Sequence, residues 1–561
     1  MGVSSSHLEY TSVIETGSGP VQGRVYHTAD GREVDGFLGI PYAKPPVGER
    51  RFKRPVPIEP WDGVRSCLQF GPRCPQVDEF FSQYLNIVGK DEAGCLTLNI
   101  LAPRWKNEEF SNGLPVMVWI HGGGFAIHSS SNYGDSSVAR NLCVKDVIFV
   151  SINYRLGALG FFTTGDEHCR GNMGLWDQTL ALQWIHDNIS HFGGDPSNLT
   201  IFGQSAGGGS VDLLSLSPVS QGLFQRVIAM AGSAENDFAF RSREAETEIS
   251  REYAKHVGFS GNIKDSEAVL EFMRAQPIGK LEIGMTGMHQ KKRFIQSHAG
   301  FLAFVPNFDG DFFPAPIAEL RRKMPKKTVM TGTTEWEGLF FAALGNLKTT
   351  VEGMRKFTRV IIKEPDYGEE FEKVRKELVD FYLGDTHPKD HQAVVKKNLQ
   401  MLGDLSINNG VFSYAKKMAH LGHDVYFYSF EHCNPDGFGL FRWLLPFRAA
   451  THCTEIRYIL GKGIISKFRP NEADCRMIAI MTSYFTNFAK YGNPNGKDTG
   501  VWDKHRSDQP YRHLKIQLPE PKMGDDYQGR RVDFWNTRIS PRNLTHPKIV
   551  GSMDFQDQPK L

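Results

Sequence analysis

The chain has 561 residues, of which 40% are hydrophobic and 23% are charged, as is typical of a globular protein. Its 65 lysines and arginines nearly balance its 63 aspartates and glutamates, and it has no long basic run, so we expect no nucleic-acid surface. No apolar run is long enough to span a bilayer, and the eight cysteines form no C-x-x-C pair, which argues against a zinc or redox site.

The N-terminal sequence bears on location. It lacks the apolar stretch of a secretory signal, so we expect an intracellular, cytoplasmic protein. Residues 1–6 fit the M-G-x-x-x-[ST] pattern for N-myristoylation of Gly2, although chance is a serious alternative for so short a pattern. A single acyl chain would give weak, reversible membrane association.

Four continuous apolar runs in the first half of the chain predict buried strands, at residues 114–120, 147–153, 199–202 and 227–230. Runs that are apolar on both faces suit a parallel sheet covered on both sides. Between the second and third runs, residues 175–189 have helical spacing. This strand–helix–strand order predicts a doubly wound α/β fold.

The second half of the chain carries fewer strand signals. We expect strands at residues 327–332 and 424–430. A last helix over residues 477–491 is expected to stop at the Gly-Asn-Pro-Asn-Gly sequence that follows it.

Two charged stretches, at about 244–323 and 348–423, look mainly helical. We interpret them as insertions that form a cap beside the functional site. No low-complexity linker, internal repeat or composition shift divides the chain, so we predict a single domain over residues 1–561 that contains both insertions.

Ser205 lies in a G-x-S-x-G pentapeptide directly after the third apolar run. Its glycines permit a sharp turn from strand to helix that exposes the serine hydroxyl. The amide of Ala206, at the start of the expected helix, would point to where an oxyanion forms. The glycine turn that begins at His121 offers further amides at Gly123 and Gly124, unless it is only a flexible loop.

These motifs make the chain similar to the type B carboxylesterases, within the carboxylesterase and cholinesterase family of α/β-hydrolases. Further matching segments are residues 37–46, 95–100, 153–157, 174–178, 192–196 and 216–218. The resemblance continues to Trp535 and implies an α/β-hydrolase fold, with a mostly parallel central sheet, helices on both faces and helical cap insertions. It also implies a serine esterase that acts on a small-molecule ester and needs no cofactor or metal.

The family pattern implies a Ser–Glu–His triad and a two-step acyl transfer through Ser205. The family's acid is a glutamate before a glycine, shortly after a strand, and Glu337 matches it; Glu335 comes two residues too early. The family's histidine is followed three residues later by a glutamate. This pattern assigns His452 as the base and Glu455 as a supporting residue.

The resemblance also implies two structural pairs. Cys74 and Cys95 match a family disulfide that closes a loop beside the site, and in a cytosolic protein it could be reduced. Arg155 and Asp177 match a pair that braces the family's sheet, and we give them no catalytic role. The second family disulfide has no counterpart here.

The chain departs from the family near the site. Gln204 replaces the usual glutamate before the serine, and His128 replaces a usual glycine near the oxyanion turn. The loop that the disulfide would close has no tryptophan near Tyr84 and Leu85, where cholinesterases bind choline. Phe238 aligns roughly with an acyl-pocket aromatic, with ordinary core as an equal alternative. The missing charge and the missing tryptophan favour uncharged esters.

We therefore predict a carboxylic ester hydrolase that cleaves neutral, mostly apolar esters through an acyl-enzyme on Ser205. An acyltransferase that uses the same triad with an alcohol acceptor is one alternative. A non-catalytic scaffold or binding protein is another, and the intact Ser205, Glu337 and His452 argue against it. The sequence specifies neither the natural ester nor the oligomeric state.

Overall fold

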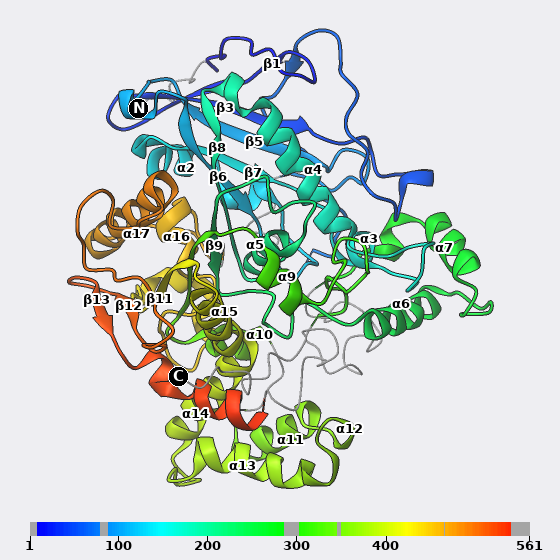
Figure 1. Cartoon of the computed structure of the whole chain (residues 1–561), viewed down its shortest axis with the longest axis vertical. Coiled ribbons are helices and arrows are strands. Elements are labelled where there is room, and N and C mark those ends of the chain that lie inside the picture. The colour runs from blue at the N-terminus through cyan, green and yellow to red at the C-terminus, as the bar shows by residue number, and fades with distance from the viewer. Residues whose placement is uncertain (1–7, 79–87, 285–301, 345–348, 465, 540–561) are drawn as a thin grey trace.

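The computed structural model describes residues 8–78, 88–284, 302–344, 349–464 and 466–539 (Figure 1). Its strands are β1 (Val21–Gln22), β2 (Arg24–His27), β3 (Glu33–Pro41), β4 (Arg65–Ser66), β5 (Thr97–Pro103), β6 (Leu114–Ile120), β7 (Ile148–Ile152), β8 (Gly194–Gln204), β9 (Arg226–Met230), β10 (Thr328–Thr334), β11 (Asp424–Phe430), β12 (His513–Ile516) and β13 (Lys522–Gly524).

Eleven of these strands form one sheet in the order β13-β12-β11-β10-β9-β8-β6-β7-β5-β3-β2. Each neighbouring pair from β12 to β7 is parallel. The pairs β12–β13, β7–β5, β5–β3 and β3–β2, at the two ends of the sheet, are antiparallel. The predicted α/β fold on a mostly parallel sheet is confirmed.

All six predicted strands are present, as β6 to β11; β6 and β11 have the predicted bounds, and the other four are shifted at their ends. The largest shift is in β8, which begins five residues before the predicted 199, at Gly194, where it pairs with Leu114 of β6. The outer strands were not predicted. Most of them are short or carry polar residues, and the buried strand β5 is interrupted by Asn99, whose amide donates to Ser130 and Ser151.

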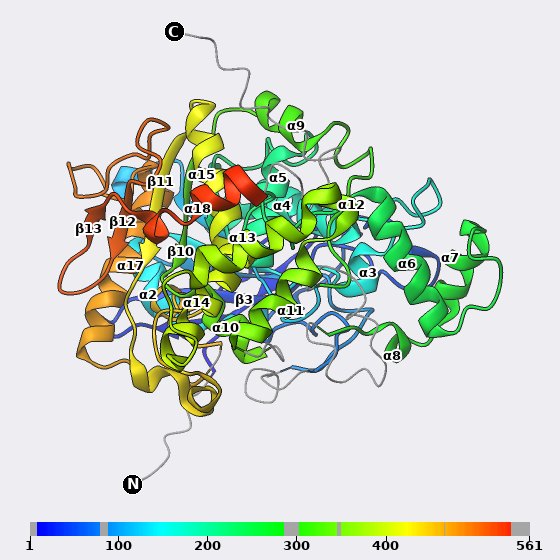
Figure 2. The same ribbon diagram turned by 90° about the horizontal axis from the view of Figure 1, so that it is seen from below.

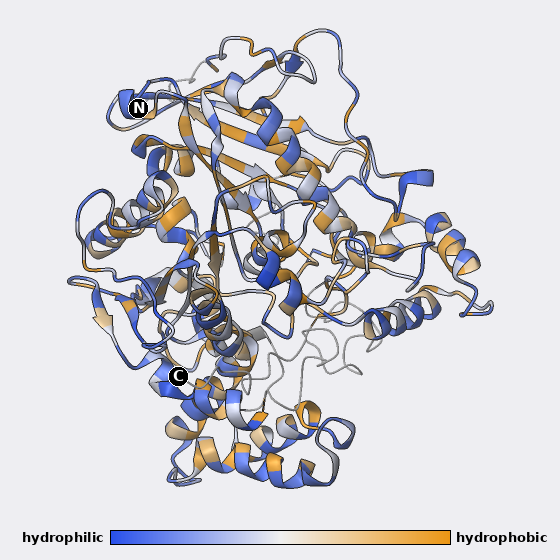
Figure 3. Cartoon of the chain, viewed as in Figure 1, coloured by the Kyte–Doolittle hydropathy of each residue, from blue (hydrophilic) through white to orange (hydrophobic). Residues whose placement is uncertain are grey.

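The central strands bury both faces, as a sheet between two helical layers requires. Along β6, Val116, Val118 and Ile120 point into one hydrophobic core, and Met117 and Trp119 point into another. The first core contains side chains of α4 (Met173–Asn188), α5 (Ala206–Leu216) and α15 (Asn409–His420). The second contains side chains of α2 (Ser136–Asn141), α16 (Ile456–Leu460) and α17 (Glu472–Tyr491). Figure 3 shows hydrophobic residues gathered on the strands.

The remaining helices are α3 (Gly157–Phe161), α6 (Arg243–Val257), α7 (Ser266–Ala275), α8 (Ile278–Leu281), α9 (Ile317–Lys323), α10 (Glu337–Leu344), α11 (Val351–Ile361), α12 (Glu364–Tyr367), α13 (Phe371–Leu383), α14 (His391–Gly403) and α18 (Val532–Phe534), with short 3-10 and π turns between elements. Of the helices in the described part of the chain, none has the length and apolarity that crossing a bilayer requires. Helix α17 begins before the predicted residue 477 because Asn471 and Asp474 cap it reciprocally.

Both predicted insertions are helical over much of their described residues. The first contains α6 to α9, and the second contains α11 to α15. Helices α11, α13 and α14 pack on one another and on Trp535 and Ile539, and they form a third hydrophobic core (Figures 1 and 2). That residues 1–561 form a single domain stays a prediction.

Arg155 and Asp177 form a buried ion pair between the end of β7 and helix α4. Their side chains are 3% and 0% exposed. The guanidinium donates to both carboxylate oxygens, at 2.8 and 2.7 Å, and the Arg155 amide donates to the same carboxylate at 3.0 Å. The remaining guanidinium nitrogen Nη1 donates to the carbonyl of Lys53 at 2.8 Å. The pair therefore joins three segments of the chain.

We expect Asp177→Asn to destabilise the protein by about 3–5 kcal/mol, because it leaves the buried guanidinium without its countercharge. Urea unfolding followed by circular dichroism measures this loss. The control Asp380→Asn removes a carboxylate from an exposed pair with Lys376 and should leave the unfolding midpoint unchanged. Equal midpoints for both variants would contradict the bracing role.

Candidate active site

Ser205 occupies a strained turn between β8 and α5. Its φ of 60° and ψ of −123° are unfavourable for a residue with a side chain. The turn is held by the Ser205 amide, which donates to the Met230 carbonyl at 2.8 Å. A Cβ on Gly207 would lie 2.1 Å from the Ile120 carbonyl oxygen, so only glycine allows α5 to pack this closely on β6. Ser205 is half-buried between two buried neighbours, which leaves it accessible at the turn.

The glycine turn after β6 lies against this serine. A Cβ on Gly122 would lie 3.2 Å from the Cβ of Ser205, and Gly123 and Gly124 have φ values of 108° and 61°. Among the described residues, we find no acceptor for the amides of Gly123, Gly124 and Ala206. Unpaired amides beside a nucleophilic hydroxyl can bind the negative oxygen of a tetrahedral intermediate.

Glu337 and His452 meet in the protein interior. Glu337 is the first residue of α10, directly after β10, and His452 lies in the loop before α16. The His452 Nδ1 lies 2.6 Å from the Glu337 Oε2, and the Thr334 amide donates to the other carboxylate oxygen at 2.6 Å. Both side chains are buried. A carboxylate at Nδ1 holds the proton there and leaves Nε2 without a proton, as a base requires.

The other two candidate glutamates have different surroundings. Glu335 is exposed, whereas Glu337 is buried, and both line a polar cavity of about 210 Å³ together with Glu431 and Lys515. Glu455 is buried close to His452. Burial, followed by the charge of Glu337, raises the pKa of Glu455 well above its usual value. The carboxyl group of Glu455 therefore loses its proton less readily than that of an exposed glutamate.

Gln204 places an amide against the imidazole of His452. The Gln204 Nε2 lies 3.4 Å from Nδ1 and 3.2 Å from Nε2 of the ring. The Cys453 thiol donates to the Gln204 Oε1 at 3.3 Å, which orients the amide. Burial raises the pKa of Cys453 well above its usual value, so this thiol keeps its proton. The described neighbours Gln204 and Cys453 thus add no charge beside the imidazole.

Aromatic rings cover the other side of His452. The ring centroids of Phe340 and Phe341 lie 5.6 and 4.8 Å from that of the imidazole. Phe341 is half-buried and packs against all three hydrophobic cores. Phe238 is half-buried against the first core.

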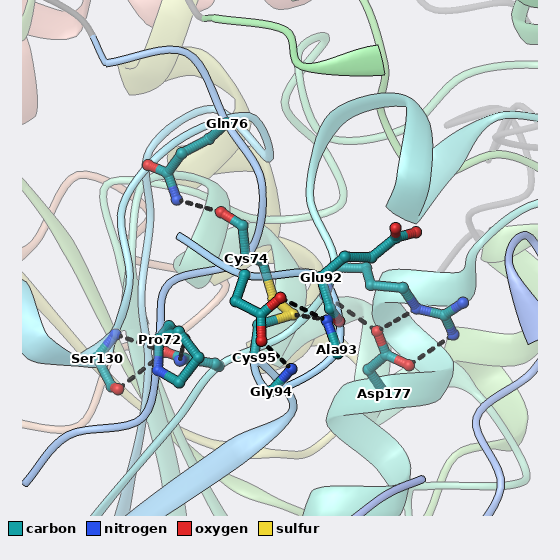
Figure 4. The surroundings of a disulfide bond; sticks show 12 residues. Pro72, Cys74, Gln76, Glu92, Ala93, Gly94, Cys95, Ser130 and Asp177 are labelled. Atoms are coloured by element: carbon teal, nitrogen blue, oxygen red, sulfur yellow. Dashed lines mark hydrogen bonds and ion pairs between the residues drawn. A yellow bond between two sulfur atoms is a disulfide. The ribbon is translucent and has the colours of Figure 1, made fainter. Parts of the chain in front are cut away.

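Cys74 and Cys95 are joined by a disulfide (Figure 4). The adjacent Gln76 links this loop to His128: its Nε2 donates to the carbonyls of Cys74 at 3.0 Å and His128 at 2.8 Å, and its Oε1 accepts the His128 amide at 2.6 Å. His128 has a φ of 80°, and its Nδ1 lies 3.1 Å from the Tyr133 hydroxyl. Burial lowers the pKa of His128 to about 4, so the ring is neutral.

The structure thus brings Ser205 next to the glycine turn, and His452 next to Glu337 and Gln204. Glu455 lies close enough to Glu337 to feel its charge. Three predicted positions, Gly2, Tyr84 and Leu85, lie outside the described residues. Sequence reasoning missed the contacts of Cys453, Gln76 and Phe341. The place of Cys453 next to His452 was a signal, but no motif marks the other two.

Known proteins resemble this chain over nearly its full length. Residues 10–535 match the model of the carboxylesterase family. Esterase cest-33 of Caenorhabditis elegans is 46% identical over 550 residues, which cover 95% of this chain and 96% of the relative. A medium-chain fatty acyl-CoA hydrolase precursor of Anas platyrhynchos is 34% identical, covering 93% and 91%. Pyrethroid hydrolase Ces2e of Rattus norvegicus is also 34% identical, covering 96% and 91%.

We expect Gln204→Glu to move the acidic limb of the pH–rate profile to higher pH by about one unit. A carboxylate at this position would stabilise protonated His452, which cannot act as a base, so activity below neutral pH would fall. The profile of kcat/KM for a neutral ester measures the shift. Gln509→Glu, which adds the same charge on an exposed loop, is the control. Identical profiles for both variants and the parent protein would refute the electrostatic role of Gln204.

Proposed function

The chain belongs to the carboxylesterase family and is a serine carboxylesterase, and we propose that it hydrolyses neutral, apolar esters through Ser205, Glu337 and His452. The observation that carries this assignment is the buried contact of 2.6 Å between His452 and Glu337. It supplies an oriented base at the carboxyl edge of the sheet, where the strained turn presents Ser205.

The proposed reaction has two steps. In the first, Nε2 of His452 removes the Ser205 proton as the serine oxygen attacks the ester carbonyl. The amides of Gly123, Gly124 and Ala206 bind the resulting oxyanion.

As the tetrahedral intermediate collapses, His452 returns the proton to the leaving alcohol, and an acyl-enzyme remains on Ser205. In the second step, a water molecule attacks the acyl carbonyl while His452 takes one of its protons. The bond between the acyl carbon and the Ser205 oxygen then breaks, His452 returns the proton to that oxygen, and the carboxylic acid leaves. Glu337 stays ionised throughout and stabilises the imidazolium that forms twice.

The preference for neutral esters rests on the lack of a further negative charge, besides that of Glu337, among the described neighbours of the imidazole. Gln204 contributes an amide, the Cys453 thiol stays protonated, and burial raises the pKa of Glu455, which disfavours its charged form. Phe341 adds an aromatic surface at His452. Two relatives are named as a fatty acyl-CoA hydrolase and a pyrethroid hydrolase, which agrees with apolar acyl or alcohol groups.

Labelling with a fluorescent organophosphonate tests the nucleophile. We expect peptide mapping to find the label on Ser205 and Ser205→Ala to abolish it, because only an activated serine attacks phosphorus readily. Ser197→Ala, which removes an exposed serine from the same strand, should label like the parent protein. A folded parent protein that takes up no label would overturn the assignment of Ser205.

A pair of isosteric esters tests the substrate class. We expect kcat/KM for 3,3-dimethylbutyl acetate to exceed that for acetylcholine, which has the same shape and a positive charge. The expected ratio is about five- to tenfold, since Gln204 provides no carboxylate to offset the free-energy cost of desolvating the cation. Gln204→Glu should reduce the ratio, and Gln509→Glu should not. A parent enzyme that favours the cationic ester would contradict the proposal.

A further inference from the structure

Residues 442–448, Arg-Trp-Leu-Leu-Pro-Phe-Arg, run from the last turn of a 3-10 helix (Pro435–Leu444) into the loop that follows it, and we call them the Trp443 loop. Trp443 is 74% exposed and the adjacent Leu444 is 51% exposed. All nine tryptophans lie in the described residues, and Trp443 alone among them is exposed. Large apolar side chains that project side by side into water indicate a surface that another body covers.

The loop is fixed at both ends. On one side the buried Phe441 packs 5.8 Å from Phe340. On the other side the half-buried Phe447 packs edge-to-face on Trp336, at 4.9 Å between ring centroids. Trp443 and Leu444 therefore project from an anchored loop. In Figure 2 the dark yellow segment that contains them lies at the lower edge of the molecule.

Positive charge surrounds the loop. Arg442 and Arg448 flank the apolar residues, and both are exposed. The segment 466–470 lies beside the 3-10 helix that leads into the Trp443 loop, since the Ser466 hydroxyl donates to the Gly437 carbonyl at 2.5 Å. It adds the exposed Lys467 and Arg469, whereas the two segments 435–450 and 466–470 contain one acidic residue, Asp436. The whole chain carries a net charge of only +2, so this excess is local.

We propose that the Trp443 loop docks the enzyme on the surface of an anionic phospholipid membrane. Tryptophan prefers the interface between headgroups and hydrocarbon, and Leu444 would enter the acyl region beside it. Arg442, Arg448 and Lys467 would bind lipid phosphates and carboxylates. A second copy of the chain fits this surface poorly, because symmetric pairing would place the same cations opposite one another.

The Trp443 loop lies close in the chain and in space to the acid–base pair of Glu337 and His452. The Trp336 amide, one residue before Glu337, donates to the carbonyl of Ala450 at 2.9 Å, and His452 follows two residues later. A docked enzyme would hold its acid–base pair close to the lipid surface, where neutral, apolar esters concentrate. An acyl group on Gly2 would add a second weak anchor to this one. The proposal concerns binding and does not depend on the ester preference.

The test uses the full chain with Gly2→Ala, which removes any acyl anchor. Co-sedimentation is measured with vesicles of phosphatidylcholine alone and with vesicles that also contain phosphatidylserine. We expect binding to the second kind, weakened about tenfold or more by Trp443→Ser with Leu444→Ser, and likewise by Arg442→Glu with Arg448→Glu. The control Val360→Ser removes an apolar side chain that is 50% exposed on α11, and it should bind like the parent protein.

Tryptophan fluorescence places the contact. Brominated lipid in the phosphatidylserine vesicles should quench part of the emission, and Trp443→Phe should remove that quenching while binding persists. Hydrolysis of a soluble short-chain ester should be unchanged in each variant, which shows that the variants are folded. Unchanged vesicle binding in the double serine variant would overturn the proposal. So would a parent protein that ignores vesicles but forms a dimer that the same variant dissociates.

Discussion

The carboxylate of Glu337 is fully buried, and an ionised group in that position must be hydrogen-bonded through both oxygens. One oxygen receives the Thr334 amide, which requires the tight turn from β10 into α10. The other faces His452, which requires the loop after β11 to reach across the end of the sheet. A second ionised carboxylate close by would be repelled, and this repulsion adds to the burial that raises the pKa of Glu455. The site's charge distribution thus follows from one buried group and its neighbours.

The sequence predicts the centre of the fold better than its edges. The strands β6 to β11 can be predicted from the sequence because both of their faces are buried, and each therefore contains a run of apolar residues. The edge strand β2 has an exposed His27 and a half-buried Arg24, and nothing in its composition separates it from a loop. The boundary of α17 was misplaced because its first turn is polar and is stabilised by capping.

In the candidate site, too, some features could be predicted from the sequence and others could not. Ser205, Glu337 and His452 stand in motifs with fixed spacing, so resemblance could assign them by register. The contact of Gln204 with the imidazole could be anticipated because Gln204 precedes the serine. The orientation of the Gln204 amide could not be anticipated, because it depends on the Cys453 thiol, which comes from the connection after β11. Likewise, the bonds of Gln76 to His128 join segments 52 residues apart and leave no local pattern.

Phe341 has a consequence for how such an enzyme can diversify. The cap helices α11, α13 and α14 have a core of their own, so substitutions within it need not disturb the packing of the sheet. Phe341 is shared by that core and both sheet cores, and its ring lies 4.8 Å from that of His452. Substitutions within this core are therefore tolerated more easily than changes at Phe341 or where α14 packs on α10, since a Cβ on Gly403 would lie 3.5 Å from that of Glu337. Selection for new substrates is expected to change residues in the cap helices and to keep an aromatic side chain at Phe341.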